Sequence, residues 1–259
     1  MAQLRSSSLS IGPVPAVATA AAGKPEVIMP GGGISKRPLH MIVMADCSGS
    51  MKGEKMQALN YALRSMLPHL VLWETSQLQA ELFIRVLAFA TIPQWHIAEP
   101  TPVADMNLRW RDLTYVPRGF TNMGPAFQEI AEVLRPNKLE RRALRPAILL
   151  VTDGQPTDPP GGFELGLATL MGTAAGRSSL RLAVAVGRDA NSGPLNRFRS
   201  PDTPVLIAES IDDIVERLVA ASIAVSRMSE VGADRNALAQ QLLQADPDPG
   251  AAPPDDTIL

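Results

Sequence analysis

Continuous apolar runs alternate with amphipathic patterns along the middle of the chain. The runs span residues 40–45, 81–90, 145–154, 180–187 and 203–209. A run without polar alternation is typical of a strand that is covered on both faces of a sheet. A further short strand over 93–99 is separated from the second run by only Thr91 and Ile92, which predicts a hairpin and an antiparallel edge.

Four segments between or after these runs have the pattern of helices. They span residues 53–70, 122–134, 163–176 and 210–226. Pro68 is expected to kink or shorten the first, Asn122 opens the second, and Ser210 caps the fourth. Glycines weaken the third. The order of elements predicts a doubly wound, Rossmann-like α/β fold with a mostly parallel central sheet, one antiparallel edge strand and helices on both faces.

Composition divides the 259 residues into three parts. Residues 1–36 are rich in Ser, Ala, Pro and Gly, and residues 229–259 are acidic and rich in Pro, so neither part can bury much apolar surface. We expect a disordered N-terminal arm, a folded domain over 37–228 and a flexible acidic tail. The arm contains RSSSLS (5–10), which fits a basophilic kinase site, but the composition favours a solvated, disordered arm.

Charge and targeting signals exclude several classes of partner. The formal net charge is −2 and the pI is about 6.0, which gives no electrostatic reason to expect nucleic acid or an anionic membrane surface. The N-terminal segment lacks the continuous apolar run of a secretory signal, and we find no apolar stretch long enough to span a membrane. Cys47 is the one cysteine in the sequence, which fits a reducing compartment. We expect a cytoplasmic protein.

Three polar clusters lie where predicted strands end or helices begin. They are Asp46-Cys47-Ser48-Gly49-Ser50, Gly119-Phe120-Thr121-Asn122 and Thr152-Asp153-Gly154. In open α/β sheets, ligands bind outside the carboxyl ends of the strands. The clusters offer two carboxylates and several hydroxyls, and such hard oxygen ligands suit Mg²⁺ or Mn²⁺.

The spacing Asp46-x-Ser48-x-Ser50, then Thr121, then Asp153-Gly154, resembles the metal-ion-dependent adhesion site (MIDAS) of von Willebrand factor A (VWA) domains. The resemblance covers about residues 38–226. It implies that Ser48 and Ser50 bind the ion directly and that Thr121 binds directly or through water. The two aspartates would hold coordinated waters. The ion would be Mg²⁺, or Mn²⁺ or Ca²⁺, with one position open to the Asp or Glu of a partner protein.

Longer segments resemble a bacterial subfamily, the TerY-like proteins of tellurite-resistance and stress systems. The segments are DCSGSMKGEKMQALNYAL, GFTNMGPAF and RPAILLVTDGQPTD. This resemblance implies a cytosolic, non-catalytic interaction domain. Its relatives are often encoded beside a PP2C-type phosphatase and a protein kinase, which implies a phospho-signalling context.

Other functions stay open from the sequence. The chain could be the adaptor subunit of an AAA ATPase of the MoxR or chelatase type, a metal-dependent hydrolase, or a structural domain whose metal site is unused. The hydrolase lacks an evident general base beyond the two carboxylates. Asp46, Ser48 and Ser50 could also cap the following helix without binding metal.

Several other side chains have both a functional and a structural interpretation. Cys47 is favoured as a small buried hydrophobe over a nucleophile. Packing or surface roles are expected for the three histidines, His40, His69 and His96. Asp158 either supports the metal loop or caps a turn before Pro159. The charged run LERRALR (139–145) is either solvated surface or a docking patch beside the site.

Overall fold

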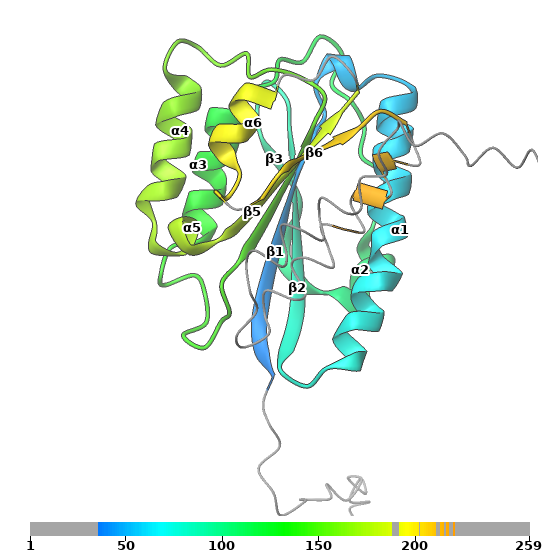
Figure 1. Cartoon of the computed structure of the whole chain (residues 1–259), viewed down its shortest axis with the longest axis vertical. Helices are drawn as coiled ribbons and strands as arrows, with labels where there is room; N and C mark the ends of the chain where they lie inside the picture. The colour runs from blue at the N-terminus through cyan, green and yellow to red at the C-terminus, as the bar shows by residue number, and fades with distance from the viewer. Residues whose placement is uncertain are drawn as a thin grey trace, which may run out of the picture. The chain divides into compact units, whose positions relative to one another are not determined.

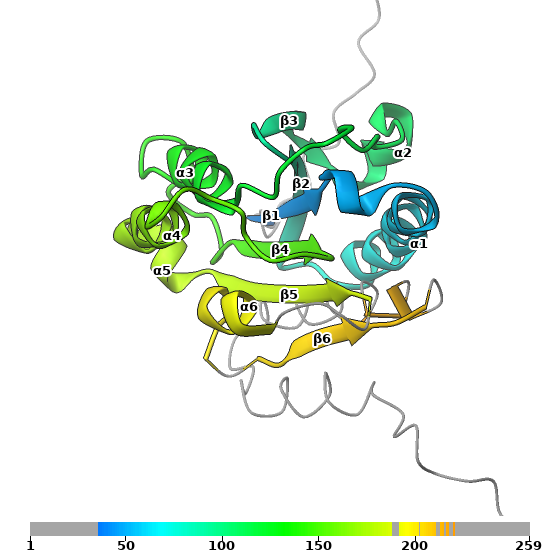
Figure 2. The same ribbon diagram turned by 90° about the horizontal axis from the view of Figure 1, so that it is seen from above.

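A computed structural model describes residues 36–187, 192–201 and 203–210, and the single positions 213, 214, 216, 217 and 220. Among these residues, six strands form one sheet (Figure 1), and Figure 2 shows their order, β3-β2-β1-β4-β5-β6. The strands are β1 Arg37–Asp46, β2 Ala80–Phe89, β3 Gln94–Pro102, β4 Ala147–Thr152, β5 Leu180–Val186 and β6 Val205–Ala208. The six strands predicted along the chain are confirmed.

All neighbouring strands pair in parallel except β2 and β3, which form the expected antiparallel hairpin at one edge. The β2–β3 register shifts near Val86, so the edge strand is irregular. This arrangement confirms the mostly parallel doubly wound fold with one antiparallel edge strand.

Helices cover both faces of the sheet. They are α1 Glu54–Ser76, α2 Met106–Arg109, α3 Met123–Val133, α4 Gly162–Gly172, α5 Ala174–Ser178 and α6 Ser192–Phe198, with 3-10 turns η1 Gly49–Met51 and η2 Val103–Asp105. Figure 2 shows α1 and α2 on one face, and α3, α4 and α6 on the other. Within the described residues, no helix is both long and apolar enough to cross a bilayer.

Successive residues of β1 face opposite layers of the core. Met41, Val43 and Ala45 pack in the layer that contains α1, whereas Ile42 and Met44 pack in the layer that contains α3. Because both faces of this central strand are buried, its sequence shows no polar alternation.

Two helix predictions differ from the structure. The first helix does not end at Pro68 but continues to Ser76. Pro68 is exposed while Met66, Leu67 and Leu70 are buried, so apolar packing on the inner face holds the helix despite the lost hydrogen bond.

The predicted helix over 163–176 is two helices, α4 and α5, divided at Thr173. The Thr173 hydroxyl accepts a 2.9 Å hydrogen bond from the Gly176 N–H and so starts a new helix. Sequence patterns also missed the short helices α2 and α6.

The last predicted helix lies mostly outside the described residues. Its described positions after Ser210 are helical, and the Ser210 hydroxyl accepts a 3.1 Å hydrogen bond from the Asp213 N–H. The N-cap role of Ser210 is therefore confirmed. The segments predicted as arm and tail, 1–36 and 229–259, lie outside the described residues except for Lys36, so the domain boundaries stay predictions.

Candidate metal site at the carboxyl edge of the sheet

Parallel pairing brings distant parts of the sequence to one edge of the sheet. β1 ends at Asp46 and β4 ends at Thr152, and the two strands are neighbours in parallel, so their carboxyl ends meet. Ser48 and Ser50 follow β1 directly, and Asp153 follows β4. The loops after these strands therefore place four of the five predicted metal ligands together.

A continuous chain of contacts joins three of these side chains. The Ser48 and Ser50 hydroxyl oxygens lie 3.0 Å apart, and the Ser50 hydroxyl donates a 2.7 Å hydrogen bond to Asp153 Oδ1. Ser48 and Asp153 are buried, whereas Ser50 is exposed. The cluster of oxygen atoms thus reaches solvent at Ser50.

Asp46 lies beneath this cluster with both carboxylate oxygens hydrogen-bonded. Its Oδ1 accepts a 2.8 Å bond from the Ser48 N–H, and its Oδ2 accepts a 2.5 Å bond from the Thr152 hydroxyl. Burial raises the pKa of Asp46; the two hydrogen bonds oppose this, and the nearby charge of Asp153 adds to it. Two carboxylates that repel each other in a buried place favour a cation between them.

Thr121, the fifth predicted ligand, comes from the loop before α3. A Cβ atom at Gly154 would lie 3.6 Å from Thr121 Oγ1 and 4.0 Å from Ser50 Oγ. The two hydroxyls therefore flank the space that glycine leaves open. The Thr121 backbone is held by Thr157, whose hydroxyl accepts a 2.7 Å bond from the Thr121 N–H.

Asp158 fixes the helix that follows Thr121. Its carboxylate accepts bonds of 3.0 Å and 2.7 Å from the N–H groups of Met123 and Gly124, the first residues of α3. This decides between the two interpretations of Asp158: the residue supports the Thr121 loop. Asn122 stands at the N-cap position, but its side chain does not cap α3 and donates instead to the Thr91 carbonyl at 2.9 Å.

Lys55 is a charged residue of the site that the sequence did not indicate. Its ammonium group contacts Asp153 Oδ2 in an ion pair. The Asp153 side chain is 1% exposed, whereas the Lys55 side chain is 42% exposed. Lys55 is the second residue of α1, so the helix places this cation over the carboxylate.

The donor atoms fit a hard divalent cation. Within the described residues, no three His, Cys, Asp or Glu side chains gather in a way that could hold a metal ion. A site at this edge must therefore draw on the hydroxyls, and Ser48, Ser50 and Thr121 supply them beside two carboxylates. Oxygen-only sets of this kind are those that Mg²⁺, Mn²⁺ and Ca²⁺ prefer.

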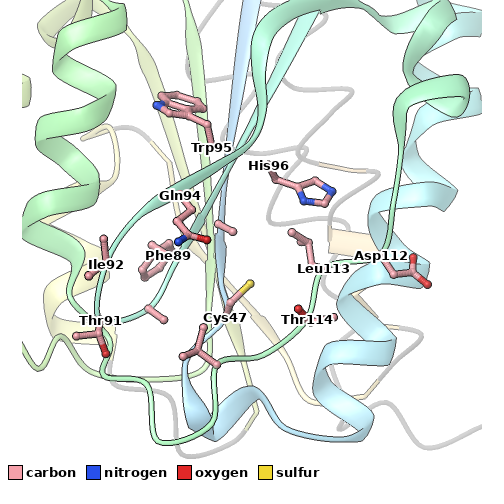
Figure 3. A pocket seen from close by; sticks show the side chains of 13 residues that line it. Cys47, Phe89, Thr91, Ile92, Gln94, Trp95, His96, Asp112, Leu113 and Thr114 are labelled. Atoms are coloured by element: carbon pink, nitrogen blue, oxygen red, sulfur yellow. The ribbon is translucent and has the colours of Figure 1, made fainter.

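A pocket of about 350 Å³ lies between β2, β3 and the loop over 112–116 (Figure 3). Cys47 and His96 both line it. Burial, with a smaller effect of the Asp46 charge, raises the pKa of the Cys47 thiol to about 12. His96 Nε2 lies 2.9 Å from the Arg111 carbonyl. A thiol that stays protonated is a poor nucleophile, so the pocket does not support a Cys-His enzyme.

The other histidines and the charged run lie away from the site. His40 is buried near the start of β1, with Nε2 2.7 Å from Glu140 Oε2, and His69 is exposed on α1. Segment 139–145 also bonds to Arg37, at the amino end of β1. The alternative of a docking patch beside the site is therefore wrong, because the run lies at the amino end of β1 whereas the site lies at the carboxyl ends of the strands. Its largely exposed residues are solvated surface.

Comparison with known proteins rests on solved structures. No protein-family model matches the sequence, and a search of curated proteins gave no match. Proximal thread matrix protein 1 from the mussel byssus superposes with a TM-score of 0.57 at 13% identity, over 73% of this chain and 49% of that protein. A second structure of it, with a zinc-occupied MIDAS motif, gives 0.58 at 14% identity, over 73% and 48%.

A von Willebrand factor type A protein from Catenulispora acidiphila gives a TM-score of 0.56 at 17% identity, over 74% of this chain and 43% of that protein. The chain thus matches less than half the length of these solved proteins. At such identities the similarity establishes the fold and nothing finer. The described residues have the α/β fold of von Willebrand factor A domains.

Proposed function

We propose that this chain is a non-catalytic module that binds partner proteins through a divalent metal ion. The observation that carries the proposal is the contact chain from Ser48 through Ser50 to Asp153, with the Thr121 hydroxyl also close to Gly154. All these donors are oxygens on the ligand-binding edge of the sheet. A structural relative, the mussel thread protein, holds zinc in its MIDAS motif, which supports a metal here.

The proposed roles follow the VWA pattern. Ser48 and Ser50 bind the ion directly, and Thr121 binds directly or through water. Asp46 and Asp153 hold coordinated waters. The ion is Mg²⁺, with Mn²⁺ or Ca²⁺ as alternatives. When bound, it acts as an electrophile that accepts a carboxylate oxygen of the partner's Asp or Glu.

Exposed apolar side chains near the site support a protein as the partner. Ile92, Val116 and Phe120 are 70%, 45% and 60% exposed. The Phe120 N–H donates to the Thr91 hydroxyl at 3.0 Å, which joins two of the loops that carry these residues. Aromatic and aliphatic side chains around a polar centre are typical of protein interfaces.

For the cellular setting we propose the TerY-like context, a cytoplasmic stress or tellurite-resistance complex with a PP2C-type phosphatase and a protein kinase. The alternative is an adaptor of a MoxR or chelatase-type AAA ATPase. Co-purification from native cells separates the two, because the first predicts recovery of the phosphatase and kinase and the second predicts recovery of the ATPase.

A hydrolase is less well supported by the geometry. Both oxygens of Asp46 accept hydrogen bonds, and both oxygens of Asp153 are engaged by Ser50 and Lys55. In the proposed site these carboxylates orient metal-bound waters, and neither is assigned as a general base. Metal-dependent cleavage of generic phosphoesters that is lost in Asp46→Ala would overturn the non-catalytic assignment.

Two linked measurements test the proposal. Isothermal titration with Mg²⁺ and Mn²⁺ should show binding by the wild type and weaker binding by Thr121→Ala. A tagged pull-down should then retain an identified partner in Mg²⁺ but not in EDTA. Thr169→Ala is the matched control, since Thr169 is exposed on α4 and bonds only within its own helix. A partner retained equally in EDTA would contradict the metal-dependent role.

A further inference from the structure

Lys55 occupies a position that helix stability does not explain. It lies in the first turn of α1, where the positive end of the helix dipole disfavours a cation. Lys52, in the preceding loop, is exposed. Lys55 instead reaches the buried Asp153 carboxylate. The favourable contact that offsets the dipole is therefore the ion pair with a residue of the metal site.

The same carboxylate cannot serve two cations equally well. Asp153 Oδ1 accepts the Ser50 hydroxyl, and its Oδ2 faces the Lys55 ammonium. A divalent ion held by Ser48 and Ser50 would lie near this ammonium, and like charges at short range repel. Because the Lys55 side chain is 42% exposed, it has a path to swing into solvent when the ion enters.

We propose that Lys55 is an internal competitor for the divalent metal, a tethered cation that neutralises Asp153 and must be displaced for the ion to bind tightly. This rests on the proposed metal site and adds to it a residue that sets its affinity. Removing the lysine charge should therefore tighten metal binding, although the same change removes an ion pair from the metal-free protein. If the ion pair were only structural, removing the lysine charge would make the protein less stable and would bring no gain in metal affinity.

The test is isothermal titration of Mg²⁺ and Mn²⁺ into the full chain and into Lys55→Gln, Lys55→Arg and Lys52→Gln, at low and at high salt. Lys55→Gln should bind metal at least about fivefold tighter, equivalent to about 1 kcal/mol, since breaking a partly exposed ion pair costs of that order. Lys55→Arg keeps the charge and should bind like the wild type. Lys52→Gln removes a charge from the loop before α1 without touching Asp153.

The advantage of Lys55→Gln should shrink at high salt, because ions screen the competing charge. Circular dichroism of each metal-free variant checks folding, and Lys55→Met replaces Lys55→Gln if that variant is unfolded. Equal or weaker binding by the neutral variants, with wild-type binding intact, overturns the inference and leaves the proposed function standing. An equal gain in Lys52→Gln also overturns it. If no variant binds metal, both the inference and the proposed function are overturned. If Lys55→Gln alone binds metal, the result supports Lys55 as the competitor.

Discussion

The Thr152 hydroxyl donates a 2.5 Å hydrogen bond to Asp46 Oδ2, so the last residue of β4 holds the last residue of β1. Both side chains are fully buried. This bond fixes the orientation of the carboxylate whose other oxygen accepts the Ser48 N–H. The turn that presents Ser48 and Ser50 therefore depends on Thr152, a residue outside the five proposed metal ligands.

Thr152→Val should destabilise the protein although valine has nearly the same shape. The change leaves one Asp46 oxygen without its donor in a buried place, which costs about 1–3 kcal/mol of unfolding free energy. Urea denaturation of the metal-free proteins measures this. Thr169→Val, on the exposed face of α4, is the control and should change stability much less. Equal stability of Thr152→Val and wild type would show that the bond contributes nothing.

The raised pKa of Asp46 predicts a pH dependence of stability in the metal-free protein. Burial, the largest cause, lifts this pKa above its ordinary value of 3.8. A carboxyl group with a higher pKa in the folded state binds its proton more tightly there. Its contribution is therefore greatest below 3.8 and is lost as pH rises through the folded value.

Asp46→Asn lacks this titration and provides the comparison. The unfolding free energy of the wild type, relative to that of Asp46→Asn, should fall as pH rises through this window and then level off. Urea denaturation of both proteins across acidic to neutral pH, without divalent metal, gives the difference. A difference that rises with pH would mean that the hydrogen bonds from Thr152 and Ser48 outweigh burial.

One glycine of α3 and one glycine of α4 should respond very differently to substitution by alanine. A Cβ atom at Gly124 would lie 2.3 Å from the Gly162 carbonyl oxygen, whereas one at Gly172 would meet nothing within 4 Å. Gly124→Ala should force α3 and α4 apart and cost about 3 kcal/mol or more, at the upper end of overpacking penalties.

Gly172→Ala is the matched control and should be neutral or stabilising by up to about 1 kcal/mol, because alanine favours helix. Thermal denaturation of the two variants measures this difference in stability. Similar melting temperatures would show that the α3–α4 contact adapts without strain. The contact matters for the site because α3 begins two residues after Thr121.

The five proposed ligands could be recognised from sequence because they belong to short segments at the ends of apolar runs. Lys55 and Thr152 could not be assigned their roles in this way. Each acts through a partner about a hundred residues away, Asp153 and Asp46 respectively. Such contacts depend on which strands become neighbours, and local patterns do not encode that pairing.

Local capping preferences also fail where a distant side chain is the better hydrogen-bond partner for a helix N-terminus. Asn122 has a favoured N-cap side chain, yet the Asp158 carboxylate accepts the first N–H groups of α3, from residues 34 and 35 positions earlier in the chain. A charged acceptor forms the stronger bond to a helix N-terminus, so it displaces the neutral amide. The helix was predictable, and the residue that caps it was not.

The cap predicts a difference between two variants that also reports on the metal site. Asp158→Ala should lower the unfolding free energy by about 1–2 kcal/mol, the range for loss of a side-chain cap. Asn122→Ala, which removes a bond to the Thr91 carbonyl but no helix cap, should cost less. Because Asp158 fixes the residues next to Thr121, its loss should also weaken Mg²⁺ binding in isothermal titration, whereas Asn122→Ala should bind nearly normally.

Metal itself should stabilise the folded chain if the proposed site binds it. An ion that binds only the native state adds about 2.7 kcal/mol at a free concentration of 100 times Kd. Thermal denaturation in Mg²⁺ should therefore show a higher midpoint than in EDTA, and Ser50→Ala should lose most of the difference. Ser65→Ala, on α1 and outside the contact chain, is the control. Ser50 is exposed and its removal leaves the core intact, so a lost shift in Ser50→Ala would report on metal binding and not on folding.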